Sequence, residues 1–470
     1  MIDTSAIDKQ VLSLIPAESS VRDKIIPLDL KNGVLSVAVK KTDKHRLMNK
    51  YAFITGYRLQ AVEYSDEEIE ETLSTLYSDT RRTSEGKNKP QNGNGSTGTA
   101  VTSSVEFVNS MIDEAIDTLS SDIHFELYEK DFRVRYRIDG HLVERVRQSG
   151  IRSHSIFSRI KVMANLDISE KRRPQDGKIK YRRGNKEIDI RVSTLPTQYG
   201  EKIVLRILDT SNLSMEIEDL GMQKEQNDLL KDAISLPFGM ILVTGPTGSG
   251  KSTTLYAVLR ALNSIDKNIV TIEDPIEYNI RGINQTHVKP DIGFTFAQAL
   301  RAFLRQDPDI IMVGEIRDGE TAEIAIRASL TGHLVLSTLH TNDSISAVTR
   351  LLDMGIDSFL VASSLKLVIA QRLVRKLCRC TRNSGTQDSS SIVPKGCQEC
   401  YYTGYKGRVG IFEMLRTDDE VSHLISKNAS VREIKKTVSE RGFLTLYDSG
   451  MDKVNNGVTT HDEIKRETAI

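Results

Sequence analysis

The stretch MILVTGPTGSGKSTT has the residue types and spacing to hold a nucleotide phosphate. Gly245, Gly250, Lys251 and Ser252 satisfy the pattern G-x-x-x-x-G-K-S. Glycines let backbone N–H groups turn inward around phosphates, and the following helix presents its positive end. Lys251 would neutralise the β/γ-phosphates and the Ser252 hydroxyl would ligate Mg²⁺. The residues expected to bind ATP or GTP are Gly245, Pro246, Thr247, Gly248, Ser249, Gly250, Lys251, Ser252 and Thr253.

Two acidic stretches would complete such a site. DPDIIMVGEIRD is an apolar strand followed by Glu315, which could hold Mg²⁺ through its water shell. The alternative is a surface acid paired with Arg317. VTIEDPIEY is a second strand that ends in the acids Glu273, Asp274 and Glu277. A carboxylate there could polarise the attacking water, whereas helix capping by Asp274 is an equally good interpretation from spacing alone.

Histidines mark the two ends of a third apolar strand, TGHLVLSTLHTND. His333 precedes the strand and His340 follows it. Most lone histidines are structural, but two beside one strand of a nucleotide-binding domain favour sensing of the γ-phosphate.

All four cysteines of the chain, Cys378, Cys380, Cys397 and Cys400, lie in one short window. Two turns that each present two thiolates, joined by a polar loop, can enclose one tetrahedral Zn²⁺. The first pair is Cys-x-Cys, in which one intervening residue makes both thiols harder to aim at the same ion. A disulfide or two idle pairs are the alternatives, and a cytosolic chain normally keeps its thiols reduced.

Composition limits the classes of protein that fit. The chain has 470 residues, enough for two or three domains, with 39% hydrophobic and 27% charged residues. Lys+Arg and Asp+Glu both total 64, so no global field attracts nucleic acid. No apolar stretch approaches the roughly 20 residues of a membrane span, and the first residues lack the pattern of a secretion signal. We therefore expect a soluble cytoplasmic protein.

The N-terminal part must be a separate small module. Residues 1–77 contain a predicted strand, GVLSVAV, and a predicted amphipathic helix, DEEIEETLSTLY. Residues 78–102 are rich in Gly, Asn, Ser and Thr, so we predict a flexible linker.

The remainder reads as two further domains. Ser103 and Glu106 have capping-box spacing, and the following apolar residues, Val105, Val108, Ile112, Ala115, Ile116 and Leu119, recur at helical intervals. FRVRYRIDG and KIKYRRGNKEIDIRV alternate apolar and charged residues around turns, which predicts antiparallel hairpins over residues 103–212. Short apolar strands then alternate with helices over residues 213–470, which predicts a parallel α/β sheet.

In order along the chain, GPTGSGKSTT, TIEDPIEY, RQDPDIIMVGEIRD and GHLVLSTLHTND resemble the Walker A, Asp box, Walker B and His box of secretion ATPases. These ATPases drive type II secretion and type IV pilus assembly. The similarity also covers SDIHFE, RIKVMANLDISEKRRPQDGKI, DIRVSTLPTQYGEKIVLRIL and GYKGRVGIFEML, so it spans roughly residues 104–470.

The resemblance implies a homo-hexameric ATPase at the cytoplasmic face of the bacterial inner membrane. Its RecA-like phosphate-loop domain would follow a PAS-like α+β domain and a small α/β module that docks on a membrane platform protein. Glu277 would be the general base and Glu315 would organise Mg²⁺. The arginines that match family positions are Arg191, Arg206, Arg301 and Arg305. Where relatives usually have PQDGR, this chain has Lys178, which lacks the planar fork of arginine.

The family also carries a four-cysteine zinc site, usually as two Cys-x-x-Cys pairs, which would form a lobe at residues 374–406. Some members bind cyclic di-GMP through an N-terminal repeat that residues 1–77 lack, so we expect no such binding.

Two other functions stay open. The basic run Arg372, Arg375, Lys376, Arg379 and Arg382 would suit a conjugation or nucleoprotein ATPase, although the zero net charge argues against nucleic acid as a partner. A scaffold that binds nucleotide without turnover is the other, against which the set Lys251, Glu277 and Glu315 argues.

Overall fold

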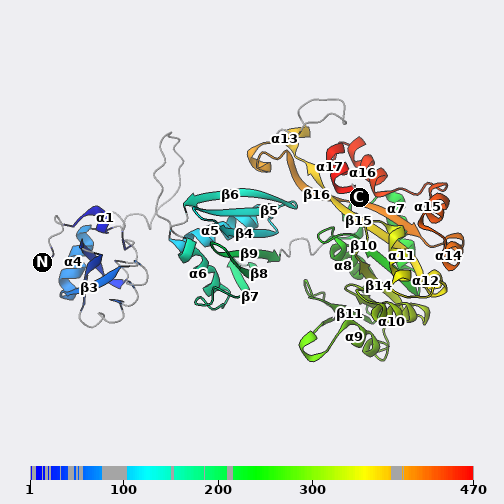
Figure 1. Cartoon of the computed structure of the whole chain (residues 1–470), viewed down its shortest axis with the longest axis horizontal. Helices are drawn as coiled ribbons and strands as arrows, with labels where there is room; N and C mark the ends of the chain where they lie inside the picture. Colours follow the sequence, from blue (N-terminus) through cyan, green and yellow to red (C-terminus); the bar gives the residue numbers. More distant parts are fainter. Residues whose placement is uncertain are drawn as a thin grey trace. The chain divides into compact units, whose positions relative to one another are not determined.

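The chain divides into two compact units, Met1–Ala100 and Val101–Ile470 (Figure 1). The computed structural model describes residues 2, 7–12, 14–15, 20, 23–31, 33–40, 47–48, 51, 55, 57–76, 103–149, 153–184, 186–208, 215–382, 394 and 396–468. Residues 78–102, the predicted linker, lie almost wholly in the first unit and outside the described residues.

The first unit is a three-stranded sheet with helices. Its elements are α1 (Lys9–Leu12), β1 (Ile26–Lys31), β2 (Val34–Val39), β3 (Arg58–Glu63) and α4 (Asp66–Leu76). The strand order is β1-β2-β3, and β2 pairs antiparallel with β1 but parallel with β3. Buried residues of β2, Leu35, Val37 and Val39, join one core cluster, while Ala38 on the other face packs with Ile69 of α4. The predicted strand and helix are both confirmed.

The second unit begins with a six-stranded antiparallel sheet. Its elements are α5 (Ser104–Asp117), β4 (Asp122–Leu127), β5 (Asp131–Ile138), β6 (His141–Ser149), α6 (Ser153–Met163), β7 (Gln175–Arg183), β8 (Lys186–Thr197) and β9 (Gly200–Leu208). The strand order is β6-β5-β4-β9-β8-β7. One face packs against α5 and α6 in a common core, so the other face carries the charged side chains that alternate along each strand.

Local signals of this sheet are largely confirmed. Ser103 and Glu106 form the predicted capping box of α5. The turn between β5 and β6 has positive φ at Asp139 (49°) and Gly140 (88°), as a two-residue hairpin requires. The helical prediction was wrong at Leu119, which lies beyond the end of α5, is 70% exposed and has a φ of 53°.

A seven-stranded sheet fills the rest of the second unit. Its strands are β10 (Gly239–Thr244), β11 (Ile269–Glu273), β12 (Asn284–His287), β13 (Ile310–Val313), β14 (Leu334–Leu339), β15 (Leu365–Leu377) and β16 (Tyr405–Arg416). The order is β12-β11-β13-β14-β10-β15-β16, parallel throughout except for the antiparallel pair β15–β16. That closing antiparallel pair was not part of the sequence prediction.

Helices cover both faces of this sheet. They are α7 (Lys224–Ile234), α8 (Lys251–Leu262), α9 (Phe296–Phe303), α10 (Gly319–Leu330), α11 (Ser344–Asp353), α12 (Ser358–Ser364), α13 (Arg379–Arg382), α14 (Asp419–Ser426), α15 (Val431–Ser439), α16 (Leu446–Asn455) and α17 (His461–Thr468). α7 and α8 belong to one core cluster, and α9 to α12 belong to another. Because the central strands are buried on both faces, their residues read as continuous apolar runs.

Across the described ranges, no helix has the length and hydrophobicity needed to cross a membrane.

Candidate functional site

The phosphate loop connects the buried strand β10 to helix α8. Three of its glycines have positive φ: Gly245 (148°), Gly248 (82°) and Gly250 (91°). A Cβ on Gly245 would lie 2.5 Å from the carbonyl oxygen of Gln371, and one on Gly250 would lie 2.7 Å from Nε2 of the same residue. The loop therefore requires glycine both for its backbone angles and for its close approach to β15.

Lys251 opens helix α8 and is bonded to its own loop. Its Nζ donates to the carbonyl oxygens of Gly245 (2.8 Å) and Pro246 (3.0 Å). Burial lowers the pKa of Lys251 and Arg372 lowers it further, while Glu315 opposes both. A phosphate entering the loop would replace two neutral acceptors with charged oxygens, which make stronger hydrogen bonds to an ammonium group.

Glu315 follows β13 by two residues and has two nitrogen-bearing partners. It accepts from Arg317 Nε (2.7 Å) and lies 3.2 Å from His340 Nε2. Burial would raise the pKa of Glu315, but Arg317 and His340 outweigh it and the pKa is lowered. Glu315 thus forms the predicted pair with Arg317, and it also lies close enough to Lys251 to affect the pKa of that lysine.

The acid that ends β11, Glu273, and the two that follow it differ in their surroundings. Glu273 is 3% exposed and accepts from Thr271 Oγ1 (2.6 Å), Gln285 Nε2 (3.1 Å) and the hydroxyl of Tyr256. Glu277 has a side chain that is 44% exposed. Asp274 lies 3.7 Å from Arg317, and no helix follows it within the described stretch 274–283, so the capping interpretation was wrong.

One cavity of about 1100 Å³ brings most of the predicted residues together. Its lining includes Thr247, Gly248, Gly250, Lys251, Ser252 and Thr253 of the phosphate loop and helix, together with Glu277, Glu315 and His340. Arg137 and Arg206 of the antiparallel sheet line it as well. The cavity therefore combines the phosphate loop with cationic side chains and with several carboxylates, among them Glu277 and Glu315.

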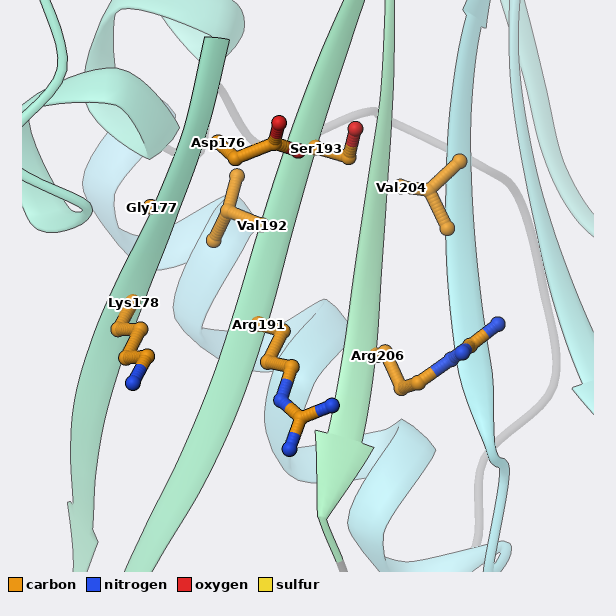
Figure 2. Close-up of a pocket in the computed structure, with 8 residues that line it drawn as sticks. All are labelled: Asp176, Gly177, Lys178, Arg191, Val192, Ser193, Val204 and Arg206. Carbon is orange, nitrogen blue, oxygen red and sulfur yellow. The ribbon is translucent and has the colours of Figure 1, made fainter. Parts of the chain in front are cut away.

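A smaller cavity of about 530 Å³ lies over the antiparallel sheet (Figure 2). Lys178, Arg191 and Arg206 occupy one row across β7, β8 and β9, as their register shows. Arg191 lies 3.8 Å from Glu277, and Arg206 Nε donates to Asp122 (2.9 Å). Like charges directly opposite each other repel, so a row of three cations is well suited to an anion.

Three of the predicted catalytic residues, Arg301, Arg305 and His333, line neither cavity. Arg301 on α9 pairs with Glu320 (2.6 Å), and Arg305 donates to the carbonyl oxygen of Arg301 (2.8 Å). His333 bonds the carbonyl oxygen of Ala328 (2.9 Å) at the opposite end of β14 from His340. Six strand residues separate two ends by about 20 Å, so only one of the two histidines can face the phosphate loop.

The four cysteines converge although the first pair is shortened. Their sulfur atoms all lie within 4.8 Å of one another, and Cys400 Sγ is 3.8 Å from both Cys380 Sγ and Cys397 Sγ. All four cysteines are in the reduced form. Burial alone would raise the pKa of Cys400, but backbone N–H groups of Cys397 and Gly404 point at its sulfur and lower that pKa to about 7. Cys378 directly follows β15 and Cys380 is the second residue of the helical turn α13, and both thiols belong to the same cluster.

Sequence reasoning missed Gln371 and Tyr256, which support the site, and gave Arg372 only as part of a basic run, whereas Arg372 is buried. Gln371 accepts from Thr254 Oγ1 (2.7 Å) on α8, and Arg372 donates to the carbonyl oxygen of Asn342 (2.9 Å). Tyr256 contacts the acids after β11. The only signal for these residues is a polar side chain in an otherwise apolar strand or helix face, which by itself does not reveal its partner.

The family model described as "Type II/IV secretion system protein" matches residues 99–466. The chain belongs to this family. This confirms the resemblance inferred from the four motifs. A second model, the MshEN domain, matches residues 2–83.

Two curated relatives show how far the similarity extends. The type IV pilus assembly ATPase PilB of Myxococcus xanthus is 43% identical over 494 aligned residues, which cover 98% of this chain and 87% of the relative. The type II secretion system protein E of Dickeya dadantii is 50% identical over 376 residues, covering 77% of this chain and 75% of the relative.

Solved structures confirm the fold class. The Legionella pneumophila ATPase DotB has a TM-score of 0.60 at 22% identity, covering 80% of this chain and 98% of that one. The pilus retraction motor PilT with bound ADP has a TM-score of 0.53 at 28% identity, covering 76% and 96%. A RecA-like domain joined to an α+β companion is thus the architecture of the second unit.

Proposed function

We propose that this chain hydrolyses ATP and that the energy drives assembly of a pilus or pseudopilus. The observation that carries the proposal is the cavity of about 1100 Å³ that joins the phosphate loop, Glu315 and Glu277. A scaffold that only binds nucleotide would need the loop alone, whereas two carboxylates facing the same loop provide for turnover.

The residues divide the work of phosphoryl transfer. Backbone N–H groups of the loop and Lys251 hold the β- and γ-phosphates, and Glu277 orients and deprotonates the attacking water. Arg191 and Arg206 neutralise charge on the transferring group from the companion sheet. His340, bonded to Glu315, senses the presence of the γ-phosphate. Arg301 and Arg305 would act only across a subunit boundary.

The donor set also fits Mg²⁺, which supplies charge neutralisation for the phosphates when it is bound. Hydroxyl and carboxylate oxygens are the ligands that this ion prefers. Ser252 is placed at the start of α8 and Glu315 faces the same cavity, so these two residues would hold it, Glu315 through water.

Pilus extension is favoured over type II secretion. The PilB of Myxococcus xanthus aligns over 98% of this chain, whereas the protein E of Dickeya dadantii aligns over 77%. The alignment with PilB therefore includes the N-terminal module of this chain to a greater extent than the alignment with protein E does. In either machine we propose a homo-hexamer in the cytoplasm, peripheral to the inner membrane. Residues 1–77 of each chain would dock this hexamer on a platform protein. Binding of nucleic acid or of cyclic di-GMP is not part of the proposal.

We also propose that the four cysteines bind one structural Zn²⁺. A tetrahedral site with Zn–S bonds of about 2.3 Å has sulfur–sulfur edges of about 3.8 Å, and two such separations are 3.8 Å here. N–H groups directed at Cys400 suit a thiolate. Four sulfurs leave no open position, so the ion would stabilise the lobe at 374–406 rather than take part in hydrolysis.

The ATPase proposal is tested by steady-state hydrolysis of Mg-ATP by the purified full chain. Native protein should turn over, and Glu315→Gln should lose about 100-fold or more in kcat while still binding nucleotide. Glu323→Gln is the matched control, because Glu323 is an exposed acid of α10 that pairs with Arg327 on the same helix and does not line the cavity. Ordinary turnover by Glu315→Gln would remove that residue from the mechanism.

The zinc proposal has its own readout. Protein purified without chelator should contain about one zinc per chain, and Cys397→Ser should lose it, while Ser389→Ala in the intervening loop should not. Substoichiometric metal together with four titratable thiols in the native chain would contradict the assignment.

A further inference from the structure

Tyr256 lies where the phosphate-loop helix meets the loop that carries Glu277. It is in the second turn of α8, five residues after Lys251, and is 1% exposed. Its ring packs edge-on against Tyr278, with centroids 4.4 Å apart and an interplanar angle of 79°. A buried hydroxyl must find partners inside the protein, and the two partners of this one are the last residue of β11, Glu273, and Glu277 in the segment that follows.

The Tyr256 hydroxyl joins two acids in different ways. It donates its one proton to the side chain of Glu273 and accepts the backbone N–H of Glu277 (3.2 Å). Burial and the nearby carboxylate of Glu273 raise the pKa of Tyr256, which keeps the hydroxyl protonated. The hydroxyl is therefore a fixed link between the end of β11 and the backbone of Glu277.

A second residue holds the same segment from the opposite side. On β12, Gln285 Oε1 accepts the N–H of Ile280 (2.7 Å), and its Nε2 donates to the carbonyl oxygen of Tyr278 (3.0 Å) and to Glu273 (3.1 Å). The backbone on the C-terminal side of Glu277 is thus bonded to a half-buried amide, and the backbone at Glu277 to a buried hydroxyl. The side chain of Glu277 itself remains half exposed and lines the cavity.

We propose that Tyr256 is a positioning residue for hydrolysis: it fixes the backbone of Glu277 relative to the phosphate loop, so that the carboxylate stays aligned with the attacking water. The inference rests on the proposed role of Glu277 as the base. Lys251 and Tyr256 belong to one rigid helix, so the groups that hold the γ-phosphate and the group that directs water move together. Misplacement of a reacting group by about 1 Å costs on the order of 100-fold in rate.

The test compares Tyr256→Phe with Tyr136→Phe in the full chain. Both substitutions remove one buried hydroxyl, because Tyr136 is fully buried and donates to the carbonyl oxygen of Met111 (2.7 Å) in the companion domain. Tyr256→Phe should lower kcat by about 10-fold to 100-fold with the KM for ATP unchanged. Tyr136→Phe should lower the melting temperature alone.

A double-mutant cycle separates positioning from a general structural loss. Single-turnover hydrolysis is measured for Tyr256→Phe, Glu277→Gln and the pair. If Tyr256 acts through Glu277, the pair should be no slower than Glu277→Gln alone. Gln285→Met, which removes the other support of the segment, should show the same loss in kcat at constant KM and provides the answer if Tyr256→Phe fails to fold.

Each other outcome overturns the proposal in a recognisable way. A Tyr256→Phe enzyme with native kcat beside an inactive Glu277→Gln would leave Glu277 as the base and remove the positioning role. Equal rate losses from Tyr256→Phe in the native and Glu277→Gln backgrounds would show an effect independent of Glu277. Ordinary turnover by Glu277→Gln would refute the base assignment and, with it, this inference.

Discussion

The two sheets of the second unit place their charged residues by different rules. In the seven-stranded sheet, β10, β11, β13 and β14 are buried along their whole length, and charges occur where the strands end. In the six-stranded sheet, the residues of β5 that face away from the core are all charged: Asp131, Arg133, Arg135 and Arg137. In the seven-stranded sheet, the position of a charged residue at a strand end therefore indicates a functional residue. In the six-stranded sheet, the position of a charged residue does not distinguish function from stability.

The difference extends to what the charges do. On the antiparallel sheet, Glu126 is 5% exposed and pairs with Arg135 (2.7 Å), Arg133 (2.9 Å) and Lys202 (3.2 Å), which makes it part of the fold. At the end of β13, Glu315 also has cationic partners, yet it lines the cavity with Lys251. We therefore expect charges at the parallel strand ends to control rate, and most charges on the antiparallel face to control stability.

The largest expected effect is at the phosphate loop. Lys251→Ala should lower ATP hydrolysis by at least about 1,000-fold, because the variant loses the ammonium group that would neutralise charge on the transferring phosphoryl group. The melting temperature should change little, since Lys251 bonds only two carbonyl oxygens of its own loop. Coupled-assay kinetics and thermal melts measure both, with the exposed Lys267→Ala as control. A Lys251→Ala variant with a lower melting temperature and a native kcat would contradict the assignment of Lys251 to catalysis.

Arg191 tests the exception on the antiparallel face. Its ion-pair partner is Glu277, 3.8 Å away in the neighbouring domain, rather than an acid of its own sheet. Arg191→Ala should lower kcat by about 10-fold to 100-fold without loss of stability, and Arg191→Lys should not restore it because lysine lacks the planar fork. Arg182 is an exposed arginine of the same sheet, and Arg182→Ala should change neither kcat nor stability.

Arg206 should show a mixed and smaller effect. It lines both cavities but also donates to Asp122 (2.9 Å), so Arg206→Ala removes a structural partner together with a charge near the phosphates. We expect a loss in kcat of about 10-fold or less, accompanied by a lower melting temperature. Equal kinetics for Arg191→Ala and Arg206→Ala would erase the distinction between the two arginines.

Glu126 is the stability counterpart, with the smallest effect on rate. Burial would raise the pKa of Glu126, but Arg135, Lys202 and Arg133 lower it from 4.5 to about 2. Because the folded pKa is depressed, the stabilisation is complete above about pH 4.5 and disappears as the pH falls towards 2. Glu126→Gln should therefore cost about 1–3 kcal/mol at pH 7.

Urea unfolding of Glu126→Gln and of the native chain at several pH values measures this difference in the free energy of unfolding. The difference should shrink steadily below pH 4.5. The kcat of Glu126→Gln should stay native. A constant stability difference from pH 7 to pH 3 would show that the carboxylate is not the source of the stabilisation.

The sequence by itself determined the features that are local. The spacing of Gly245, Gly250 and Lys251 fixes a phosphate loop because glycine angles and a following helix are properties of consecutive residues. The acids after β11 and β13 were found in the same way, because parallel strands align their carboxyl ends at one edge. The hairpin at Asp139–Gly140 is a local feature of the same kind.

Only the tertiary structure decided which of the alternating or isolated polar residues meet. His333 and His340 flank one strand, but strand length separates them, so one faces the phosphate loop and the other caps a helix. Tyr256 and Glu277 are 21 positions apart and bond because a helix and a strand end pack together. Such contacts depend on how elements far apart in the sequence are packed, and no pattern of neighbouring residues encodes that packing.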